Sequence, residues 1–280
     1  MPSASFSEKV CVVTGAASGL GRELCVQLAR AGAKIVAADI NEGGLAETLA
    51  RLKEEGEAKT VLTDVTVSDA VGALIRGAAS DFGRLDYLFN NAGIAIGGEI
   101  RDQTPEHWRK VLDVNLLGAI HGVHAAYPIM ARQGFGQIVN IASVAGLVAF
   151  PMAAPYSASK FALVGLSRAL AIEARAFGIR VTMACPGFID TPIVASPNVN
   201  ADSAAVAKMI ASRLGLVPVE RAARKILAGV ARRKRMIVFP AYARLLVLLD
   251  RVSPALSDWA MEEFVRGFRA IRREPLEPAP

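Results

Sequence analysis

Three polar residues in the second half of the chain have the types and spacing needed for proton transfer at a carbon–oxygen centre. Tyr156 and Lys160 are four residues apart at the start of an expected helix, so both side chains can project from one face. The pKa of an unperturbed tyrosine is about 10, and a nearby ammonium favours the phenolate. Tyr156 could then act as a general acid or base. Ser143, at the end of an expected strand, could hold a substrate oxygen through a hydrogen bond.

Each of these residues also has a purely structural interpretation. Ser143 could cap a turn, Tyr156 could belong to the core, and Lys160 could be an exposed helix lysine. We favour the chemical interpretation because each residue follows an expected strand or opens an expected helix.

A glycine-rich turn follows the first expected strand. It has the sequence Gly15-Ala16-Ala17-Ser18-Gly19-Leu20-Gly21 and leads directly into a helix. Glycines allow the backbone to approach a pyrophosphate, whose charge is stabilised by the free N–H groups at the helix start. The same glycines could instead serve only loop geometry and helix packing.

Asp39 ends the second expected strand. A carboxylate there can accept hydrogen bonds from both hydroxyls of an adenosine ribose and would repel a 2′-phosphate. No lysine or arginine lies between Gly15 and Gly21 to attract such a phosphate. These features predict NAD rather than NADP as the cofactor, although Asp39 or Asn41 could also be a helix N-cap.

The elements that must position these residues alternate between short β-branched runs and longer amphipathic segments. Strands such as 10–14 are apolar without alternation, as expected when helices cover both faces of a parallel sheet. The pattern predicts an α/β fold with a doubly wound parallel sheet of the Rossmann type. The expected strands cover 10–14, 34–38, 60–63, 85–89, 137–141, 180–184 and 236–239, and the expected helices cover 20–31, 42–55, 68–82, 105–132, 156–177, 241–251 and 257–271.

The domain organisation expected from the sequence is simple. No glycine-rich or charged linker divides residues 1–240, which we interpret as one NAD-binding and catalytic domain. Residues 241–280 form a helical C-terminal extension, with two helices separated by Pro254. Its apolar run 245–249 could pack on a neighbouring subunit, cover the pocket or rest in a lipid interface, in that order of preference.

The glycine spacing Gly-x-x-x-Gly-x-Gly and the pair Tyr156-x-x-x-Lys160 resemble those of the short-chain dehydrogenase/reductase family, in its single-domain branch. Further family motifs follow in the family's order over residues 8–240: Asp64-Val65, Asn90-Asn91-Ala92-Gly93, Asp113-Val114-Asn115, Ser143 and Pro186-Gly187-x-x-x-Thr191. The resemblance implies an NAD(H)-dependent oxidoreductase that moves a hydride between nicotinamide and an alcohol or carbonyl carbon.

The resemblance also implies catalytic roles. Tyr156 would be the general base in oxidation and the general acid in reduction, and the positive charge of oxidised nicotinamide would help to lower its pKa. Lys160 would also hold the nicotinamide ribose, Asn115 would position a water in a proton relay, and Ser143 would orient the substrate.

Cofactor contacts are implied in the same way. Asp64 and Val65 would contact the adenine ring, residues 90–93 would lie beside the adenine ribose, and Thr191 with the Ile189 backbone would fix the carboxamide. The full expected cofactor-binding set is Gly15, Ser18, Gly19, Leu20, Gly21, Asp39, Asp64, Val65, Asn90, Asn91, Ala92, Gly93, Tyr156, Lys160, Pro186, Gly187, Ile189 and Thr191.

The residues that would rim the substrate space, by analogy with the family, are nearly all apolar. They are Ile94, Ala95, Leu147, Val148, Phe150, Met152, Phe188, Ile193 and Val194. A sugar buried among them would leave its hydroxyls unpaired, so we expect an apolar secondary alcohol or ketone of steroid, retinoid or long-chain type. Residues 195–216 are expected to form a mobile lid.

Composition and cysteine usage agree with a folded enzyme. The chain is 52% hydrophobic and 21% charged, which argues against disorder along most of its length. Cys11, Cys25 and Cys185 occur singly, so we expect neither disulfides nor a zinc site and predict no bound metal. No apolar stretch reaches the roughly 18–20 residues needed to span a bilayer, and we expect a cytoplasmic protein.

The net charge of +6 is concentrated near the C-terminus, because residues 213–280 carry 14 Lys and Arg against 7 Asp and Glu. We interpret this region as a solvated basic surface and the run 232–235 as a charged helix end that enters an edge strand, and we expect no nucleic-acid partner. A weak peripheral contact of the C-terminal helices with a membrane stays open.

Homo-oligomerisation, as a dimer or a tetramer, is expected from the family alone, because helices like 106–132 and 156–177 commonly form a four-helix interface there. His121 and His124 lie on the first of these helices. They have a spacing that can serve metal ligation, but without further ligands in the pattern we favour simple packing.

Two other functions remain possible. A regulator that binds a dinucleotide without turnover normally has a broken catalytic set, whereas all four catalytic positions are present here. An epimerase or dehydratase of the related extended branch would need a separate substrate domain and a different glycine spacing.

Overall fold

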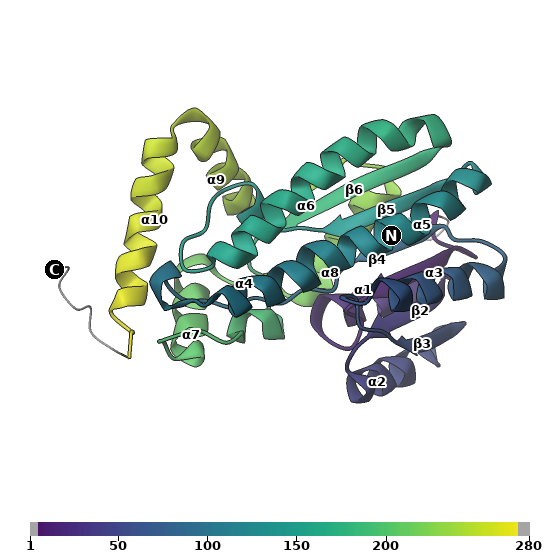
Figure 1. The fold of residues 1–280 in the computed structure, drawn as a ribbon, viewed down its shortest axis with the longest axis horizontal. Helices are drawn as coiled ribbons and strands as arrows, with labels where there is room; N and C mark the ends of the chain where they lie inside the picture. The colour runs from purple at the N-terminus through teal and green to yellow at the C-terminus, as the bar shows by residue number, and fades with distance from the viewer. Residues whose placement is uncertain (1–4, 274–280) are drawn as a thin grey trace.

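A computed structural model describes residues 5–273, which form a seven-stranded parallel sheet in the order β3-β2-β1-β4-β5-β6-β7 (Figure 1). This confirms the predicted doubly wound sheet of the Rossmann type. The strands are β1 (Val10–Thr14), β2 (Lys34–Asp39), β3 (Ala58–Leu62), β4 (Tyr87–Asn90), β5 (Gly136–Ile141), β6 (Ile179–Pro186) and β7 (Met236–Phe239).

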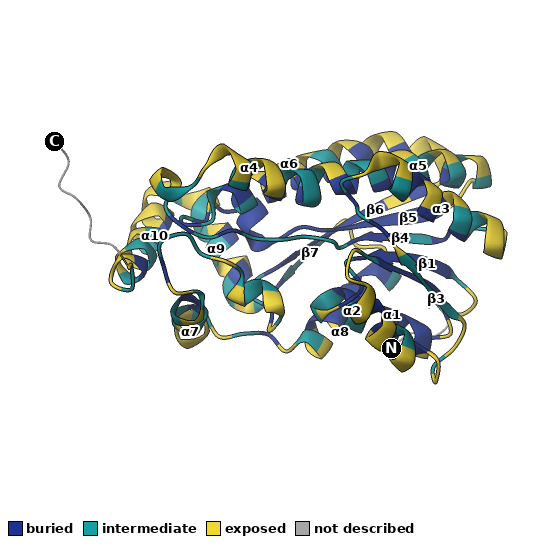
Figure 2. Cartoon of the chain, turned by 60° about the horizontal axis from the view of Figure 1, so that its bottom comes forward, coloured by how far each residue is buried: buried dark blue, intermediate teal, exposed yellow. Residues whose placement is uncertain are grey.

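Helices cover both faces of the sheet, as Figure 2 shows by the buried strands between two helical layers. One layer contains α1 (Gly19–Arg30), α2 (Glu42–Leu52) and α8 (Val219–Ala231), and the other contains α3 (Ser68–Phe82), α4 (Pro105–Leu112), α5 (Gly118–Gln133) and α6 (Ala154–Glu173). Strand β1 is buried over its whole length, with Cys11 and Val13 in one core and Val12 in the other. This explains why its sequence is apolar without alternation.

The order of the strands determines where a site can form. The chain moves outward from β1 to β2 and β3, then returns to the other side of β1 with β4. The carboxyl ends of β1 and β4 therefore flank a switch point, where α/β sheets bind ligands in a crevice.

The expected helix over 105–132 is interrupted in the structure. A π-helical turn, η3 (Asp113–Leu117), separates α4 from α5 and contains Asn115. Such turns are frequent at functional sites because they rotate the side chains that follow.

One helix was not predicted, and of another only the charged end near 232–235 was expected. Helix α7 (Ser203–Leu214) lies within the expected lid and begins where the Asp202 carboxylate accepts hydrogen bonds from two backbone N–H groups. Helix α8 buries one apolar stripe, which includes Ile226 and Val230, and exposes its basic residues. That the region over 195–216 moves as a lid stays a prediction.

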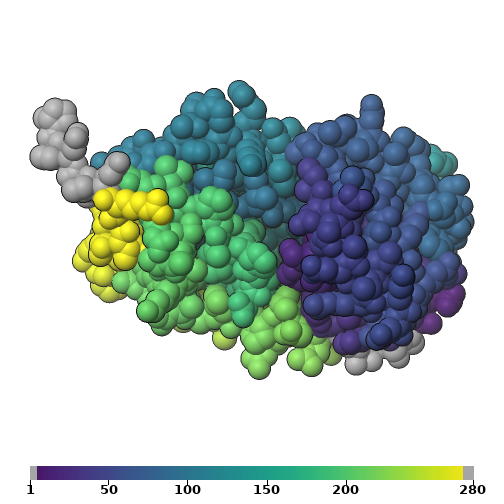
Figure 3. Space-filling view, turned by 90° about the horizontal axis from the view of Figure 1, so that it is seen from below, coloured from purple at the N-terminus to yellow at the C-terminus, as the bar shows by residue number. Residues whose placement is uncertain are grey.

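The C-terminal extension folds as α9 (Ala241–Val252) and α10 (Pro254–Arg269), with Pro254 as the first residue of α10 rather than as a separator. Ala243 and Val247 of α9 pack in a small core with Val144 and Val148. In Figure 3 the yellow end of the described chain lies against the green segment that includes α7. Among the described helices, none is long and apolar enough to cross a membrane.

Candidate active site

A cavity of about 1140 Å³ lies at the carboxyl ends of the strands. It extends from the glycine-rich turn after β1 to residues of α7 and α10. All of the predicted catalytic and cofactor-binding residues line it except Asn90 and Asn115. Residues that are far apart in the sequence thus meet at one edge of the sheet.

Asn90 differs from the expectation that it lies beside the adenine ribose. Its side chain is buried and donates to the Asn140 side chain at 2.9 Å and to the Ala119 carbonyl at 3.3 Å. The side chain points between the sheet and α5, so the residue joins β4 to its neighbours beneath the cavity.

Asn115 also lies behind the cavity wall. Its Oδ1 accepts from the Ile94 N–H at 2.8 Å, and its Nδ2 donates to the Ile94 carbonyl at 2.9 Å and to Ser159 Oγ at 3.1 Å. Asn115 therefore holds the loop after β4 in place. The water relay implied for it stays a prediction.

The glycine-rich turn fits a pyrophosphate. Gly15 and Gly19 have φ values of 67° and 49°, which favour glycine. A Cβ on Gly15 would lie 2.7 Å from Ala92 Cα, so the turn also packs closely on the loop after β4. The first turn of α1 has no side-chain cap and no acidic residue, which leaves its N–H groups available to an anion.

Asp39 lies where a ribose could bind. Its two carboxylate oxygens accept from the Ala17 and Asn41 N–H groups, each at 2.9 Å, and its side chain lines the cavity. The N-cap of α2 is Asn41, whose Oδ1 accepts from Gly44 N–H at 2.9 Å, so Asp39 is not the cap. Arg22, which follows the turn, pairs with Glu47 at 2.8 Å.

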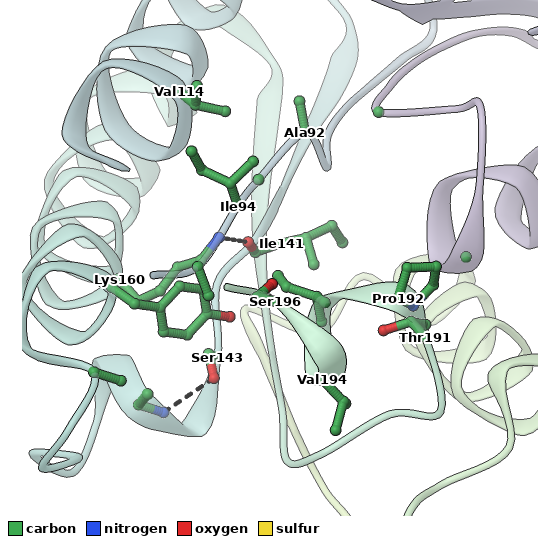
Figure 4. A pocket seen from close by; sticks show the side chains of 18 of the residues that line it. Ala92, Ile94, Val114, Ile141, Ser143, Lys160, Thr191, Pro192, Val194 and Ser196 are labelled. Atoms are coloured by element: carbon green, nitrogen blue, oxygen red, sulfur yellow. Dashed lines mark hydrogen bonds between the residues drawn. The ribbon is translucent and has the colours of Figure 1, made fainter. Parts of the chain in front are cut away.

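Lys160 is held beside Tyr156 at the centre of the cavity. Lys160 Nζ donates to the Ile141 carbonyl at 2.9 Å (Figure 4) and lies 5.5 Å from the centroid of the Tyr156 ring. Burial lowers the pKa of Lys160 to about 8. The ammonium is thus held beside the tyrosine, and its contact with a nicotinamide ribose stays a prediction.

Burial has the largest effect on the pKa of the Tyr156 hydroxyl. Removal of the hydroxyl from water raises it, and the hydrogen bond with Ser143 only partly opposes that change. Ser143 Oγ also accepts from the Ala145 N–H at 3.1 Å. That Lys160 and the positive charge of oxidised nicotinamide together lower this pKa stays a prediction.

Most of the expected substrate rim lines the cavity: Ile94, Ala95, Phe150, Met152, Phe188, Ile193 and Val194. The prediction was wrong for Leu147 and Val148, which pack with residues of α9 because the turn η4 (Val144–Gly146) directs them there. The sequence reasoning missed two pairs of apolar wall residues, Val206 with Ile210 and Phe264 with Phe268. The spacing of four within each pair was the available signal, since it places both side chains on one helix face.

No metal site is evident at the remaining candidates. His121 Nδ1 lies 2.9 Å from the Val65 carbonyl, and His124 is exposed. Within residues 5–273 no group of three or more His, Cys, Asp and Glu side chains could hold a metal ion. The three cysteines are buried and unpaired.

Comparison with known proteins assigns the family. A family model described as short chain dehydrogenase matches residues 9–202. The chain belongs to the short-chain dehydrogenase family. This membership confirms the predicted family and the predicted class of oxidoreductase, and it agrees with the fit of the cavity to a dinucleotide.

Individual short-chain dehydrogenases resemble the chain over different lengths. The cis-4-hydroxycyclohexanecarboxylate dehydrogenase of Sinomonas cyclohexanicum is 43% identical over 68% of this chain and 77% of its own. The putative oxidoreductase SadH of Mycobacterium tuberculosis is 34% identical over 89% of this chain and 92% of its own. A short chain dehydrogenase/reductase from Burkholderia phymatum, solved in complex with NAD, is 32% identical with a TM-score of 0.83 and covers 99% of both chains.

Proposed function

We propose that this short-chain dehydrogenase uses NAD(H) to interconvert an apolar secondary alcohol and its ketone. The observation that carries the proposal is the position of Tyr156, Lys160 and Ser143 within one cavity. One end of this cavity is lined by the glycine-rich turn and Asp39, where a dinucleotide would bind, and the other end is apolar. The NAD complex of the Burkholderia phymatum relative supports the cofactor. The Sinomonas relative is named for a hydroxylated cyclohexane ring, which supports a secondary alcohol on an apolar frame.

Two tasks would fall to the protein's own residues: transferring the proton, and orienting the substrate and the cofactor. NAD, when bound, supplies the hydride acceptor and a positive charge beside Tyr156. The Ser143 hydroxyl would hold the substrate oxygen, and Tyr156 Oη would take the alcohol proton during oxidation and return it during reduction. Lys160 would stabilise the phenolate and hold the nicotinamide ribose.

Asp39 would select NAD over NADP. Each carboxylate oxygen of Asp39 uses one backbone N–H and retains capacity to accept from a ribose hydroxyl. A 2′-phosphate would face this charge without a compensating cation from Arg22, which is engaged by Glu47.

The substrate would be of steroid, retinoid or long-chain type. Phe150, Phe188 and Met152 line the cavity near the catalytic group, and their side chains offer no hydrogen-bonding partner to a polyol. A bulky apolar alcohol fits this surface better than a sugar.

A homo-oligomer would form through α5 and α6. Three large apolar residues are exposed here, which is unusual for their type. Leu117, just before α5, is 42% exposed, and Phe161 and Ile172 on α6 are 43% and 68% exposed. Sedimentation of the wild type and of Phe161→Glu should show a dimer or tetramer that the variant weakens.

The test of the proposed function is NADH formation with a panel of secondary alcohols and NADH consumption with the matching ketones. We expect apolar alcohols to react faster than polyols, NAD to be preferred over NADP, and Tyr156→Phe to be nearly inactive. Faster turnover of polyols would reject the substrate class, and a preference for NADP would reject the role of Asp39.

A further inference from the structure

Helix α10 forms the wall of the cavity at its apolar end. Phe264 and Phe268, four residues apart, line the cavity, and Phe268 is only 1% exposed. The Phe264 ring meets Phe150 edge-on, with 5.6 Å between centroids and 75° between planes, and Phe150 meets Phe188 in the same way at 5.5 Å and 76°. Aromatic rings from three distant segments thus pack together in the wall of the cavity.

Three of the segments that line this end of the cavity contribute no charged residue to it. The cavity-lining residues contributed by 150–153, 186–210 and 264–268 include no Asp, Glu, Lys or Arg. The charged residues that line the cavity come from other segments, such as Asp39, Asp64 and α4. A charged group bound among the phenylalanines would therefore lose its hydration without gaining an ion pair from these three segments.

Ion pairs fasten the end of α10 to the loop that precedes α4. The Arg272 guanidinium makes two hydrogen bonds to Asp102, at 2.7 and 2.9 Å, and also pairs with Glu99. Arg269 donates to the same Glu99 at 2.7 and 2.9 Å. The Arg272, Glu99 and Asp102 side chains are exposed by only 6%, 10% and 14%, so salt screens these pairs weakly.

Backbone contacts join the same end of the chain to the segment before α7. Arg272 forms an antiparallel bridge with Ala201, and the Arg273 N–H donates to the Asn200 carbonyl at 3.1 Å. Gly97 in turn exchanges hydrogen bonds of 2.9 Å with 197 and 199. Three segments, at 97–102, 197–201 and 272–273, thus meet over the apolar end of the cavity, where Figure 3 shows the yellow and green parts of the chain in contact.

We propose that α10 is the wall that limits the size of the substrate, with Phe264 and Phe268 as the residues that determine specificity and Arg272 as the residue that positions them. The chamber accepts an alcohol or ketone whose non-reacting end is an uncharged apolar ring or branched alkyl group, and the two phenylalanines set its greatest length. This inference rests on the proposed function, because it identifies the part of the substrate that the same cavity selects.

The test is the dependence of kcat/KM on substrate length, measured by NADH formation with 4-alkylcyclohexanols of increasing alkyl length. Phe264→Ala and Phe268→Leu should shift the optimum to longer alkyl groups, with a gain of about fourfold in kcat/KM for each methylene newly accommodated. Trp259→Ala is the matched control, since Trp259 lies on α10 but is 59% exposed. The dependence of kcat/KM on alkyl length (the length profile) should be the same in Trp259→Ala as in the wild type.

The positioning role of Arg272 has its own readout. Arg272→Gln should broaden the length profile and raise KM while the Kd for NAD stays unchanged, and Arg272→Lys should restore part of the selectivity. Thermal unfolding of each variant checks that it is folded, and Phe264→Leu replaces Phe264→Ala if the latter is unfolded.

The outcomes separate this inference from the proposed function. Wild-type turnover with shifted profiles in the phenylalanine variants would support both. Wild-type turnover with unchanged profiles in folded Phe264 and Phe268 variants would overturn the role of α10 alone. A wild type that oxidises no alcohol in the series would overturn both.

Discussion

Replacing Lys160 by methionine is expected to change how the free energy of unfolding depends on pH. Lys160 is 3% exposed, and burial lowers its pKa from 10.5 to about 8. Between these two pKa values the unfolded chain binds more protons than the folded chain, so the wild-type free energy of unfolding rises with pH. The stability contributed by the neutral lysine is fully present above the unfolded pKa and is lost as pH falls through the folded pKa.

The size of the effect follows from the difference between the two pKa values. The difference is 10.5 − 8 = 2.5 units, which corresponds to about 3 kcal/mol. Methionine has no charge to bury. The free energy of unfolding of Lys160→Met, relative to that of the wild type, should therefore be about 3 kcal/mol greater at low pH than at high pH.

Urea unfolding of both proteins, followed by circular dichroism between about pH 7 and about pH 10, measures the effect. Lys53→Met is the matched control because Lys53 is exposed. A stability difference between wild type and Lys160→Met that stays constant over this range would refute the reasoning that burial suppresses the charge of Lys160.

Two further predictions concern the cofactor-binding half of the cavity. Asp39→Ser should lower the preference for NAD over NADP by roughly 10- to 100-fold, since hydrogen bonds to a charged group contribute about 1.5–3 kcal/mol; dissociation constants for the two cofactors measure this, and an unchanged ratio would contradict it. Gly21→Ala should weaken NAD binding and destabilise the fold by about 1–3 kcal/mol, because the added Cβ would overlap the Gly15 carbonyl oxygen. Gly77→Ala on α3, where a Cβ meets nothing within 4 Å, should instead stabilise by up to about 1 kcal/mol, and equal effects in thermal unfolding would count against this packing argument.

The sequence alone predicted the sheet and most of the cavity for one physical reason. The carboxyl ends of parallel strands converge at one edge, so residues that directly follow those strands must lie close together. Asp39 at the end of β2, Ser143 shortly after β5 and Gly187 directly after β6 all line the cavity as expected.

The direction of single side chains was harder to predict. Asn90, the last residue of β4, turns toward Asn140 and α5, while Asn91, just after the strand, lines the cavity. Likewise, Val148 faces α9 although Phe150 faces the cavity. Such differences depend on local turns that residue types do not determine.

The contribution of the C-terminal extension depended on contacts between distant parts of the chain. The sequence suggested that this segment could cover the pocket, but it did not identify Phe264 and Phe268 as wall residues. Their position requires the pairing of Arg272 with Asp102 and Glu99, which are about 170 residues away. Local periodicity carries no information about such pairs.

The central claim, that Tyr156 exchanges a proton with the substrate during hydride transfer to NAD, is tested most directly by single-turnover NADH formation in Tyr156→Phe. We expect a rate about 10²- to 10⁴-fold below that of the wild type, with an unchanged dissociation constant for NAD. Tyr87→Phe, a change on β4 outside the cavity, should keep the wild-type rate. Wild-type rates of NADH formation in Tyr156→Phe would exclude Tyr156 as the residue that exchanges a proton with the substrate.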